Sequence, residues 1–268
     1  MKNTTNQLGI IALVAVIGFF VMACNKADPE TDFYFEPSSN SQGMVITGYK
    51  GNNVNVVIPA KIQKLPVVEV GGFLGKNIIS VVIPASVNGI GAEAFANCSN
   101  LTSIVIPASV NGIGAYAFAN CSNLTSIVIP ANVKEIGLKA FQNCSNLTSV
   151  DFKGKEVIIE EGAFGYCGEL NKLVFSGTLK PLEYNGKIGW EEERIGNNVY
   201  RKLYTEHYFY RPSSNARDGS TFYFHSGANA FFGCDKLPPA TLSKLKEMGF
   251  LEPEEIRELE GKARRREL

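Results

Sequence analysis

The sequence lacks an excess of charge of either sign. Lys plus Arg and Asp plus Glu each total 26 in 268 residues, so the formal net charge is zero. This balance argues against a partner bound through general basicity, such as a nucleic acid. Hydrophobic residues make up 45% of the chain and charged residues 19%. The chain therefore has enough apolar surface to bury a core, and wholesale disorder is excluded.

Residues that perform catalysis or hold metals are also scarce. The chain has two histidines, His207 and His225, and six cysteines, none of which are paired at the Cys-x-x-Cys spacing of a zinc site. Six cysteines are too few to build a disulfide-stabilised miniprotein of this length. No Ser/His/Asp set, Cys/His dyad or phosphate-binding loop is recognisable. We expect no enzymatic activity, no cofactor and no metal.

The N-terminus has the pattern of an export signal. Lys2 precedes an apolar run that ends at Ala23 and is slightly shorter than the roughly 20 residues of a membrane-spanning helix. The segment Val21-Met22-Ala23-Cys24 resembles the lipobox of bacterial lipoproteins, which implies cleavage before Cys24 and a lipid on its sulfur. An ordinary cleaved signal and an uncleaved anchor are the alternatives, and all three export the protein. We predict a lipoprotein signal peptide over residues 1–23.

The stretch after this signal is polar. Residues 24–43 mix Asp, Glu, Pro and Ser with few aliphatic side chains. Such a composition favours a solvated chain over a packed element. We predict a flexible tether that holds a folded body away from a membrane surface.

A period of 23 residues dominates the middle of the chain. Three residue types recur at this interval: Cys98, Cys121, Cys144 and Cys167; Pro84, Pro107 and Pro130; Phe95, Phe118, Phe141 and Phe164. Weaker copies begin at Ile58 and Phe152, and a last copy begins at Phe175 and is interrupted. A unit of 23 residues cannot bury its apolar side alone, so neighbouring units must stack to create a core.

Each unit is predicted to form one coil of a solenoid. The spacing of Leu101, Ile104 and Ile106 points alternate residues of a short strand inward, so Ser103 and Val105 should point outward. A proline directly after the strand ends the pairing by removing a donor. On the opposite wall, two glycines should permit a tight bend and four side chains should face the interior: Gly112 and Gly114; Val110, Ile113, Phe118 and Cys121.

The full pattern is Ile-Pro-x-x-Val-x-x-Ile-Gly-x-x-Ala-Phe-x-x-Cys-x-x-Leu-x-x-Ile. It is present at residues 83–104 and 106–127, with a close variant at 129–150, and it resembles the BspA-like leucine-rich repeats of bacterial surface proteins. The resemblance implies a leucine-rich-repeat solenoid that serves as an exported adhesion or protein-interaction scaffold. We predict this solenoid over residues 44–177, with a parallel β-ladder on one face and turns and short helical segments on the other.

The outward positions of the predicted ladder form two rows that are candidates for partner binding. Their members are Ser80, Ser103, Ser126, Ser149 and Lys172 in one row, and Val82, Val105, Val128, Asp151 and Val174 in the other. Regular spacing at the strand separation suits a partner that docks along the face. The alternative is that β-branched residues stand here only because they stabilise strands.

The recurring cysteines invite a redox or metal hypothesis in an exported protein. Equivalent side chains in stacked coils point the same way rather than at each other, so disulfides are disfavoured. We expect buried thiols that act as small apolar fillers beside the phenylalanines. The neighbouring Asn97 and Asn100 lie in Asn-x-Ser/Thr sequons, but their repeat positions indicate that they satisfy backbone groups of turns.

An insertion over residues 178–221 interrupts the last copy. It is rich in aromatic residues, and candidates for partner contact are Trp190, Tyr200, Tyr204, Tyr208 and Tyr210. The segments 208–210 and 222–224 have the composition of paired strands. Aromatic and arginine side chains are typical of interface hot spots, although a protruding insertion also needs aromatics for its own core. The sequence leaves both roles open.

The chain closes with a final repeat and a helical segment. The final repeat is predicted over residues 222–239, with Phe231, Cys234 and Leu237 at the repeat positions. Leu242, Leu245 and Met248 then recur at helical spacing and Gly249 stops the run. We predict a C-terminal cap over residues 240–268, because an open last coil would expose its core and strand edge.

These features favour a non-enzymatic cell-surface lipoprotein. It would bind a protein of a host or neighbouring cell through the solenoid face and insertion, and would be attached to the outer membrane or cell surface through its N-terminal lipid. The alternative is a structural or cargo-binding lipoprotein that works in the periplasm or envelope. A pocket formed by the insertion over the solenoid edge would be needed for an enzyme, and no catalytic residue set supports one.

Overall fold

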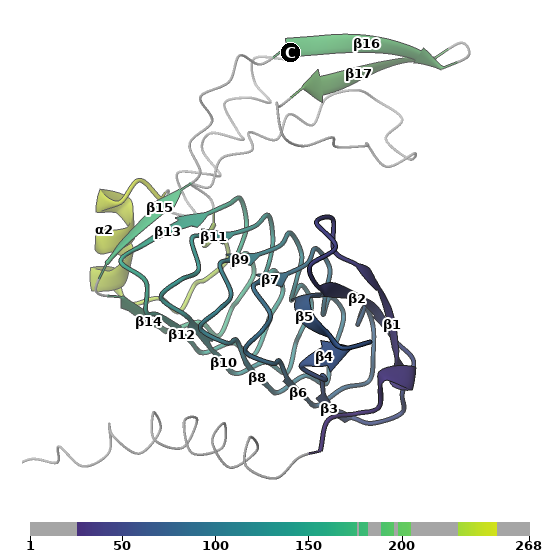
Figure 1. Cartoon of the computed structure of the whole chain (residues 1–268). Coiled ribbons are helices and arrows are strands. Elements are labelled where there is room, and N and C mark those ends of the chain that lie inside the picture. Colours follow the sequence, from purple (N-terminus) through teal and green to yellow (C-terminus); the bar gives the residue numbers. More distant parts are fainter. Residues whose placement is uncertain (1–25, 176, 182–188, 196–197, 205–229, 251–268) are drawn as a thin grey trace, which may run out of the picture.

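The repeat region folds into a solenoid whose two long sides are ladders of parallel strands (Figure 1). The computed structural model describes residues 26–175, 177–181, 189–195, 198–204 and 230–250. The first ladder contains β3 (Asn55–Val57), β6 (Ser80–Val82), β8 (Ser103–Val105), β10 (Ser126–Ile129), β12 (Ser149–Phe152) and β14 (Lys172–Phe175). β3, β6 and β8 form one hydrogen-bonded sheet, and β10, β12 and β14 form another.

The second ladder is part of a nine-stranded sheet on the other side of the core. Its parallel strands are β2 (Met44–Tyr49), β5 (Leu65–Val70), β7 (Gly89–Ile90), β9 (Gly112–Ile113), β11 (Glu135–Ile136), β13 (Glu156–Ile159) and β15 (Thr178–Pro181). β1 (Phe33–Pro37) and β4 (Lys61–Ile62) pair antiparallel with β2 and β5. The prediction of short helical segments on this side is therefore wrong for the described repeats, which have short strands and turns there.

The inward and outward positions predicted for each coil are confirmed. Leu101, Ile104 and Ile106 are buried, whereas Ser103 and Val105 are exposed. The residues predicted to face the core from the opposite wall are also buried: Val110, Ile113, Phe118 and Cys121. Ser80 pairs with Ser103, and Gly89 with Gly112. Both ladders thus repeat at the sequence period, so equivalent side chains stack on one another.

Gly114, directly after β9, allows close approach between coils, whereas open space surrounds the missing Cβ of Gly112. A Cβ atom on Gly114 would lie 2.6 Å from the backbone nitrogen of Ala92 in the preceding coil. The left-handed backbone that the turn requires is instead adopted by Tyr116 and Asn120, with φ of 57° and 60°. The role predicted for Gly112 and Gly114 was therefore wrong, because the bend lies further along the coil.

A column of stacked aromatic rings runs through the core. It contains Tyr49, Phe73, Phe95, Phe118, Phe141, Phe164 and Phe231, and neighbouring ring centroids are 5.0–5.3 Å apart. The interplanar angles lie between 1° and 25°. Constant register places identical rings at the coil spacing, where offset stacking is favourable. The column joins every coil to its two neighbours.

The N-terminal end of the solenoid is closed by residues that the sequence predicted to be a tether. Residues 30–32 form the 3-10 helix η1 (Glu30–Asp32), and β1 then pairs with β2. Phe33 is buried and its ring centroid lies 5.3 Å from that of Tyr49. The tether prediction is therefore wrong from residue 26 onward, because apolar residues of β1 cover the first coil.

A tight contact inside this end depends on Gly72. Its φ is 77°, and a Cβ atom at this position would overlap the carbonyl group of Thr47 and the backbone nitrogen of Gly48. The absence of a side chain lets β2 approach the segment that follows β5. Gly75 also has a positive φ, of 66°, but open space surrounds its missing Cβ.

The last coil is assembled from two segments separated by the insertion. β14 and β15 precede the insertion, and residues 230–237 follow it. Phe164 N–H donates to the Ala230 carbonyl oxygen at 2.8 Å, and the Phe231 ring stacks on that of Phe164. β15 pairs with β13 through Thr178 to Pro181, so the predicted start of the insertion at residue 178 is too early.

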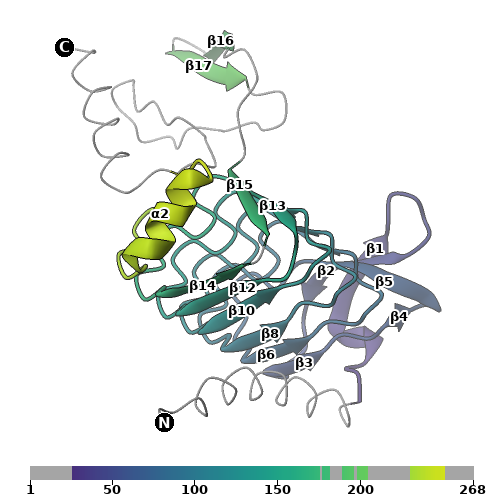
Figure 2. The same cartoon turned by 90° about the vertical axis from the view of Figure 1, so that its left-hand side faces the viewer.

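A short helix lies at the C-terminal end of the stack (Figures 1 and 2). This helix, α2 (Pro239–Glu247), begins with a proline, whose missing N–H costs no hydrogen bond in the first turn. Phe250 N–H donates to the Leu245 carbonyl oxygen and Gly249 N–H to that of Lys246, which is a Schellman ending. Leu245 and Phe250 are buried in the core. The helix thus covers the open end of the last coil, as predicted, and the rest of the predicted cap lies outside the described residues.

The described part of the insertion is one antiparallel hairpin. β16 (Gly189–Ile195) pairs with β17 (Asn198–Tyr204), and Trp190 lies opposite Leu203 in the register. The strands predicted at 208–210 and 222–224 lie outside the described residues. Among the residues that the structure describes, no helix is long and apolar enough to cross a membrane.

Candidate binding surface

The outward side chains of the first ladder form a continuous surface, which we call the strand face. Its strands lie side by side from β3 to β14 (Figure 2). The register sets Val82 beside Val105 and Ser80 beside Ser103. It continues the rows from Ser126 to Ser149 and Lys172, and from Val128 to Asp151 and Val174. The structure thus brings the ten residues predicted for the two rows onto one side of the molecule.

The valine row is the more exposed apolar part of this face. Val105, Val128 and Val174 are 47%, 40% and 40% exposed, which places them among the most exposed large apolar residues of the described chain. The serine row beside them offers hydroxyl groups that can donate and accept hydrogen bonds. Val128 and Val105 lie on adjacent coils with no charge between them. The strand face is therefore apolar and hydroxyl-bearing at its centre.

Charge appears on the strand face only toward its C-terminal end within the described rows. Asp151 takes the place of a valine and its carboxylate forms an ion pair with Lys153 at 2.7 Å. Lys172 takes the place of a serine on the next strand. Lys172 lies in the coil that the insertion interrupts, and Asp151 lies in the coil before it. The C-terminal end of the strand face thus carries charged side chains, whereas the rows before it are uncharged.

An additional row of threonines borders the strand face and was missed by sequence reasoning. Thr102 Oγ1 donates to the Ile79 carbonyl oxygen at 3.2 Å, and Thr148 Oγ1 donates to that of Thr125 at 2.9 Å. Each bond joins two successive coils. The repetition of Leu-Thr-Ser in the sequence was the signal that could have revealed this row.

The repeated asparagines form ladders between coils. Asn120 Nδ2 donates to Asn97 Oδ1 at 2.8 Å, and Asn143 Nδ2 donates to Asn120 Oδ1 at 2.9 Å. Asn100 Nδ2 similarly donates to Asn77 Oδ1. The prediction that Asn97 and Asn100 bond to turn backbone was wrong: amides at the same position in stacked coils reach one another. The left-handed φ of 60° at Asn97 is the conformation that asparagine tolerates best after glycine.

The recurring cysteines are buried free thiols. Each donates from Sγ to the carbonyl oxygen of the ladder phenylalanine in the preceding coil, at 3.0–3.2 Å, in Cys98, Cys121, Cys144, Cys167 and Cys234. Burial raises the pKa of Cys98 to about 11 and raises the pKa of Cys121 further. The described residues contain no group of three His, Cys, Asp or Glu side chains placed to hold a metal ion. These thiols therefore fill space in the core, and each forms a hydrogen bond to the preceding coil.

Thiol chemistry offers a direct check on this assignment. In the folded chain the five buried cysteines are expected to resist a reagent such as DTNB at neutral pH, because the thiolate is the reactive form and burial in apolar surroundings disfavours it. In urea, where the thiols are exposed, all five should react. Since burial raises the folded-state pKa of Cys98 and Cys121, their contribution to stability is fully present below the ordinary thiol pKa of about 8.5 and is lost as the pH rises toward about 11. Urea unfolding at pH 7, 9 and 10.5 measures the decline. Fast labelling of the folded chain with Cys24 replaced by serine would contradict buried thiols.

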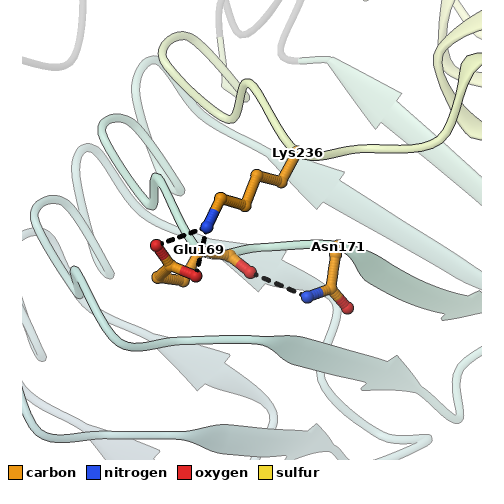
Figure 3. A network of polar contacts seen from close by, with 3 residues as sticks. All are labelled: Glu169, Asn171 and Lys236. Atoms are coloured by element: carbon orange, nitrogen blue, oxygen red, sulfur yellow. Dashed lines mark hydrogen bonds and ion pairs between the residues drawn. The ribbon is translucent and has the colours of Figure 1, made fainter.

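Polar contacts tie together the two segments that flank the insertion (Figure 3). Lys236 Nζ forms an ion pair with Glu169, 2.6 Å from both carboxylate oxygens. Asn171 Nδ2 donates to the Glu169 backbone oxygen at 3.2 Å. Both ionic side chains are about half exposed, so the pair adds little stability. The pair joins the segment before the insertion to the segment after it.

The aromatic residues predicted for partner contact are placed unequally by the structure. Trp190 belongs to β16, and Tyr200 and Tyr204 belong to β17, where Tyr204 lies opposite Gly189. Tyr208 and Tyr210 lie outside the described residues. A role for these five residues in binding stays a prediction.

Comparison with known families identifies the repeat. Residues 68–186 match the family described as BspA type leucine rich repeat region, in six copies. The repeat region is a BspA-type leucine-rich repeat. The match includes the strands of the strand face from β6 to β14, and it confirms the fold and the resemblance predicted from the sequence.

Comparison with solved structures finds other bacterial leucine-rich-repeat proteins. The T. pallidum leucine rich repeat protein TpLRR is 24% identical, with a TM-score of 0.53 over 84% of this chain and 97% of that chain, and this likeness shows the fold. A leucine-rich repeat protein from Bacteroides ovatus is 26% identical, with a TM-score of 0.46 over 59% of this chain and 43% of that one. A leucine rich cell surface protein from Faecalibacterium prausnitzii is 22% identical, with a TM-score of 0.39 over 68% and 59% of the two chains. Comparison with curated proteins finds no significant match.

The BspA-type repeat narrows the class of function. Its family suggests a protein-binding or adhesion module, and its members are typically bacterial surface proteins. Leucine-rich repeats are typically non-enzymatic binding modules.

Proposed function

We propose that this protein is a non-enzymatic, lipid-anchored surface protein that binds a protein of a host or neighbouring cell. The strand face makes the principal contact, and the insertion adds contacts beside it. The observation that carries the proposal is the exposed row of Val105, Val128 and Val174 along a hydroxyl-bearing ladder. Anchoring at Cys24 and location at the outer membrane or cell surface complete the proposal.

The chemistry of the strand face indicates the kind of contact. Exposed valines are too small to act as single anchors, so affinity must come from many contacts along the rows. Because the centre of the face lacks charge, binding there should depend only weakly on salt. A partner with an extended or flat apolar surface fits these requirements.

A pair of lysine substitutions tests the strand face. Val105→Lys with Val128→Lys places two unpaired charges in the middle of the face, where partner binding would desolvate them. Partner retention should fall by about tenfold or more, a loss of about 1.4 kcal/mol or more in binding free energy. Binding is measured with the chain from residue 24 immobilised and partners captured from intact cells by cross-linking. Their dissociation constants are then determined with purified protein.

Matched substitutions on the opposite ladder provide the control. Asn88→Lys with Asn111→Lys adds the same charge at exposed positions, and the next coil already carries Lys134 at the equivalent place, whose N–H donates to the Asn111 carbonyl oxygen at 2.9 Å. This variant should bind as the unaltered chain does. Equal retention by both double variants would remove the strand face from the proposal.

The insertion and the surface location are tested separately. Binding that is unaltered after residues 182–229 are replaced by a Gly/Ser loop would remove the insertion from the proposal. Protease treatment of intact cells tests surface location, and complete protection of the protein would contradict it.

A further inference from the structure

The chain is fixed to the solenoid only four residues after Cys24. Asp28 is 8% exposed and extends the edge of β3: its N–H donates to the Val57 carbonyl oxygen at 2.9 Å, and Val57 N–H donates to its Oδ2 at 2.8 Å. Asn53 Nδ2 donates to the other carboxylate oxygen at 2.5 Å. A charged group in this position is stabilised by two donors. The three contacts hold the chain at the first strand of the first ladder.

This fixed point sets the distance between the anchor and the fold. Four residues span at most about 14 Å when fully extended. A lipid on Cys24 would therefore keep Asp28 within that distance of the membrane surface. We infer that the N-terminal end of the solenoid faces the membrane directly, with the coils stacked outward from it. The inference rests on the lipid anchor of the proposed function, and it replaces the idea of a tether that holds the body away.

The opposite end of the molecule then points away from the lipid. From β3 to β14 the first ladder has five steps of about 4.8 Å, or about 24 Å in all. α2 covers this far end, and the insertion leaves the solenoid there, after Pro181. The rows of the strand face run along the same direction. The insertion is thus attached where a protein on another cell can reach it.

The chemistry of the N-terminal end suits contact with lipid headgroups rather than insertion among acyl chains. Exposed side chains around the exit point carry both signs of charge, as in Lys26, Glu30 and Lys61. Gln63 N–H donates to Glu30 Oε2 at 3.2 Å, which places the turn between β4 and β5 beside η1. Charged groups stay hydrated at the headgroup level and are costly in the hydrocarbon. We therefore expect this end to rest on the membrane without penetrating it.

Site-specific quenching measures which end lies at the bilayer. The chain from residue 24, which contains every described residue, is joined through Cys24 to a maleimide lipid in phosphatidylcholine vesicles, while the buried thiols stay unmodified. A fluorophore is attached to a clickable azide residue at position 52, beside Asn53, or at position 243, which is exposed on α2. Headgroup-labelled quencher lipids should quench the fluorophore at position 52 and leave the one at position 243 bright.

A spacer separates the effect of the fixed point from any other attraction to lipid. Ten Gly/Ser residues between Lys26 and Ala27 should abolish quenching at position 52 while the thermal melt stays unchanged. Equal quenching at both positions, or quenching at position 52 that survives the spacer, would overturn the inference. Mass spectrometry of the N-terminal peptide from native membranes tests the anchor separately, because an unmodified Cys24 would remove the lipid from the proposed function while leaving the vesicle result intact.

Discussion

Phe118→Ala is expected to lower the free energy of unfolding by about 3–5 kcal/mol, the cost of a cavity left by a buried phenylalanine. Phe118 is fully buried, and its ring centroid lies 5.3 Å from that of Phe95 and 5.0 Å from that of Phe141. Because both neighbouring rings are held by their own coils, the column cannot collapse into the space. Urea unfolding followed by circular dichroism gives the difference.

The control for this substitution uses an outward side chain of the adjacent coil. Val105→Ala removes an apolar group that is 47% exposed and should change the free energy of unfolding by no more than about 0.5 kcal/mol, as surface substitutions usually do. If Phe118→Ala costs less than about 1 kcal/mol, well below the usual range for a buried phenylalanine, the aromatic column does not carry the stability assigned to it.

Gly72→Ala is expected to be the second large loss. The left-handed backbone costs a non-glycine residue about 1–2 kcal/mol, and overlap with backbone atoms adds about 1–3 kcal/mol. Gly72 combines both, because its φ is 77° and its Cβ would meet the carbonyl of Thr47. The thermal midpoint and urea unfolding should both fall, and β2 should lose protection from hydrogen exchange first.

Two other glycines separate the conformational and steric parts of this loss. Gly75→Ala meets open space at a φ of 66°, so only the left-handed cost of about 1–2 kcal/mol should appear. Gly112→Ala also meets nothing within 4 Å and lies in β9 without a positive φ, so it should be neutral or stabilise by about 0.4–1 kcal/mol. An order other than Gly72, Gly75, Gly112 in the size of the loss would contradict this explanation.

Sequence reasoning succeeded where one constraint repeats. A strand position such as Ile104 recurs in every coil with the same neighbours, so a single interpretation of its direction holds for all of them. The same repetition made the aromatic column and the buried thiols foreseeable from Phe95 and Cys98. It also placed Ser103 and Val105 on the outer side. The periodic part of the strand face was therefore predictable residue by residue.

Structural features that do not follow the repeat were not predicted from the sequence. Apart from Phe33–Phe35, residues 26–37 are rich in charged residues and proline, as a tether would be. Nothing local reveals that Asp28 finds two donors on β3 and Asn53. These contacts bring together residues 25 or more positions apart, which composition does not encode. The strands of the second ladder were missed for a related reason, although the inward residues of that wall were predicted. Strands of two residues such as β9 are too short to show a period, and they exist because neighbouring coils supply their hydrogen bonds.

Two successive coils, residues 83–105 and 106–128, differ only at Glu93 and Tyr116. Each of these coils contacts the next through the backbone pairs of the second ladder, the ring stack and a thiol hydrogen bond, so the contacts between coils are interchangeable. Removal or duplication of one such segment in the gene would restore the same joints and shift the far end of the molecule by about 4.8 Å. Recombination can thus change the length of the solenoid by whole coils while the fold stays the same.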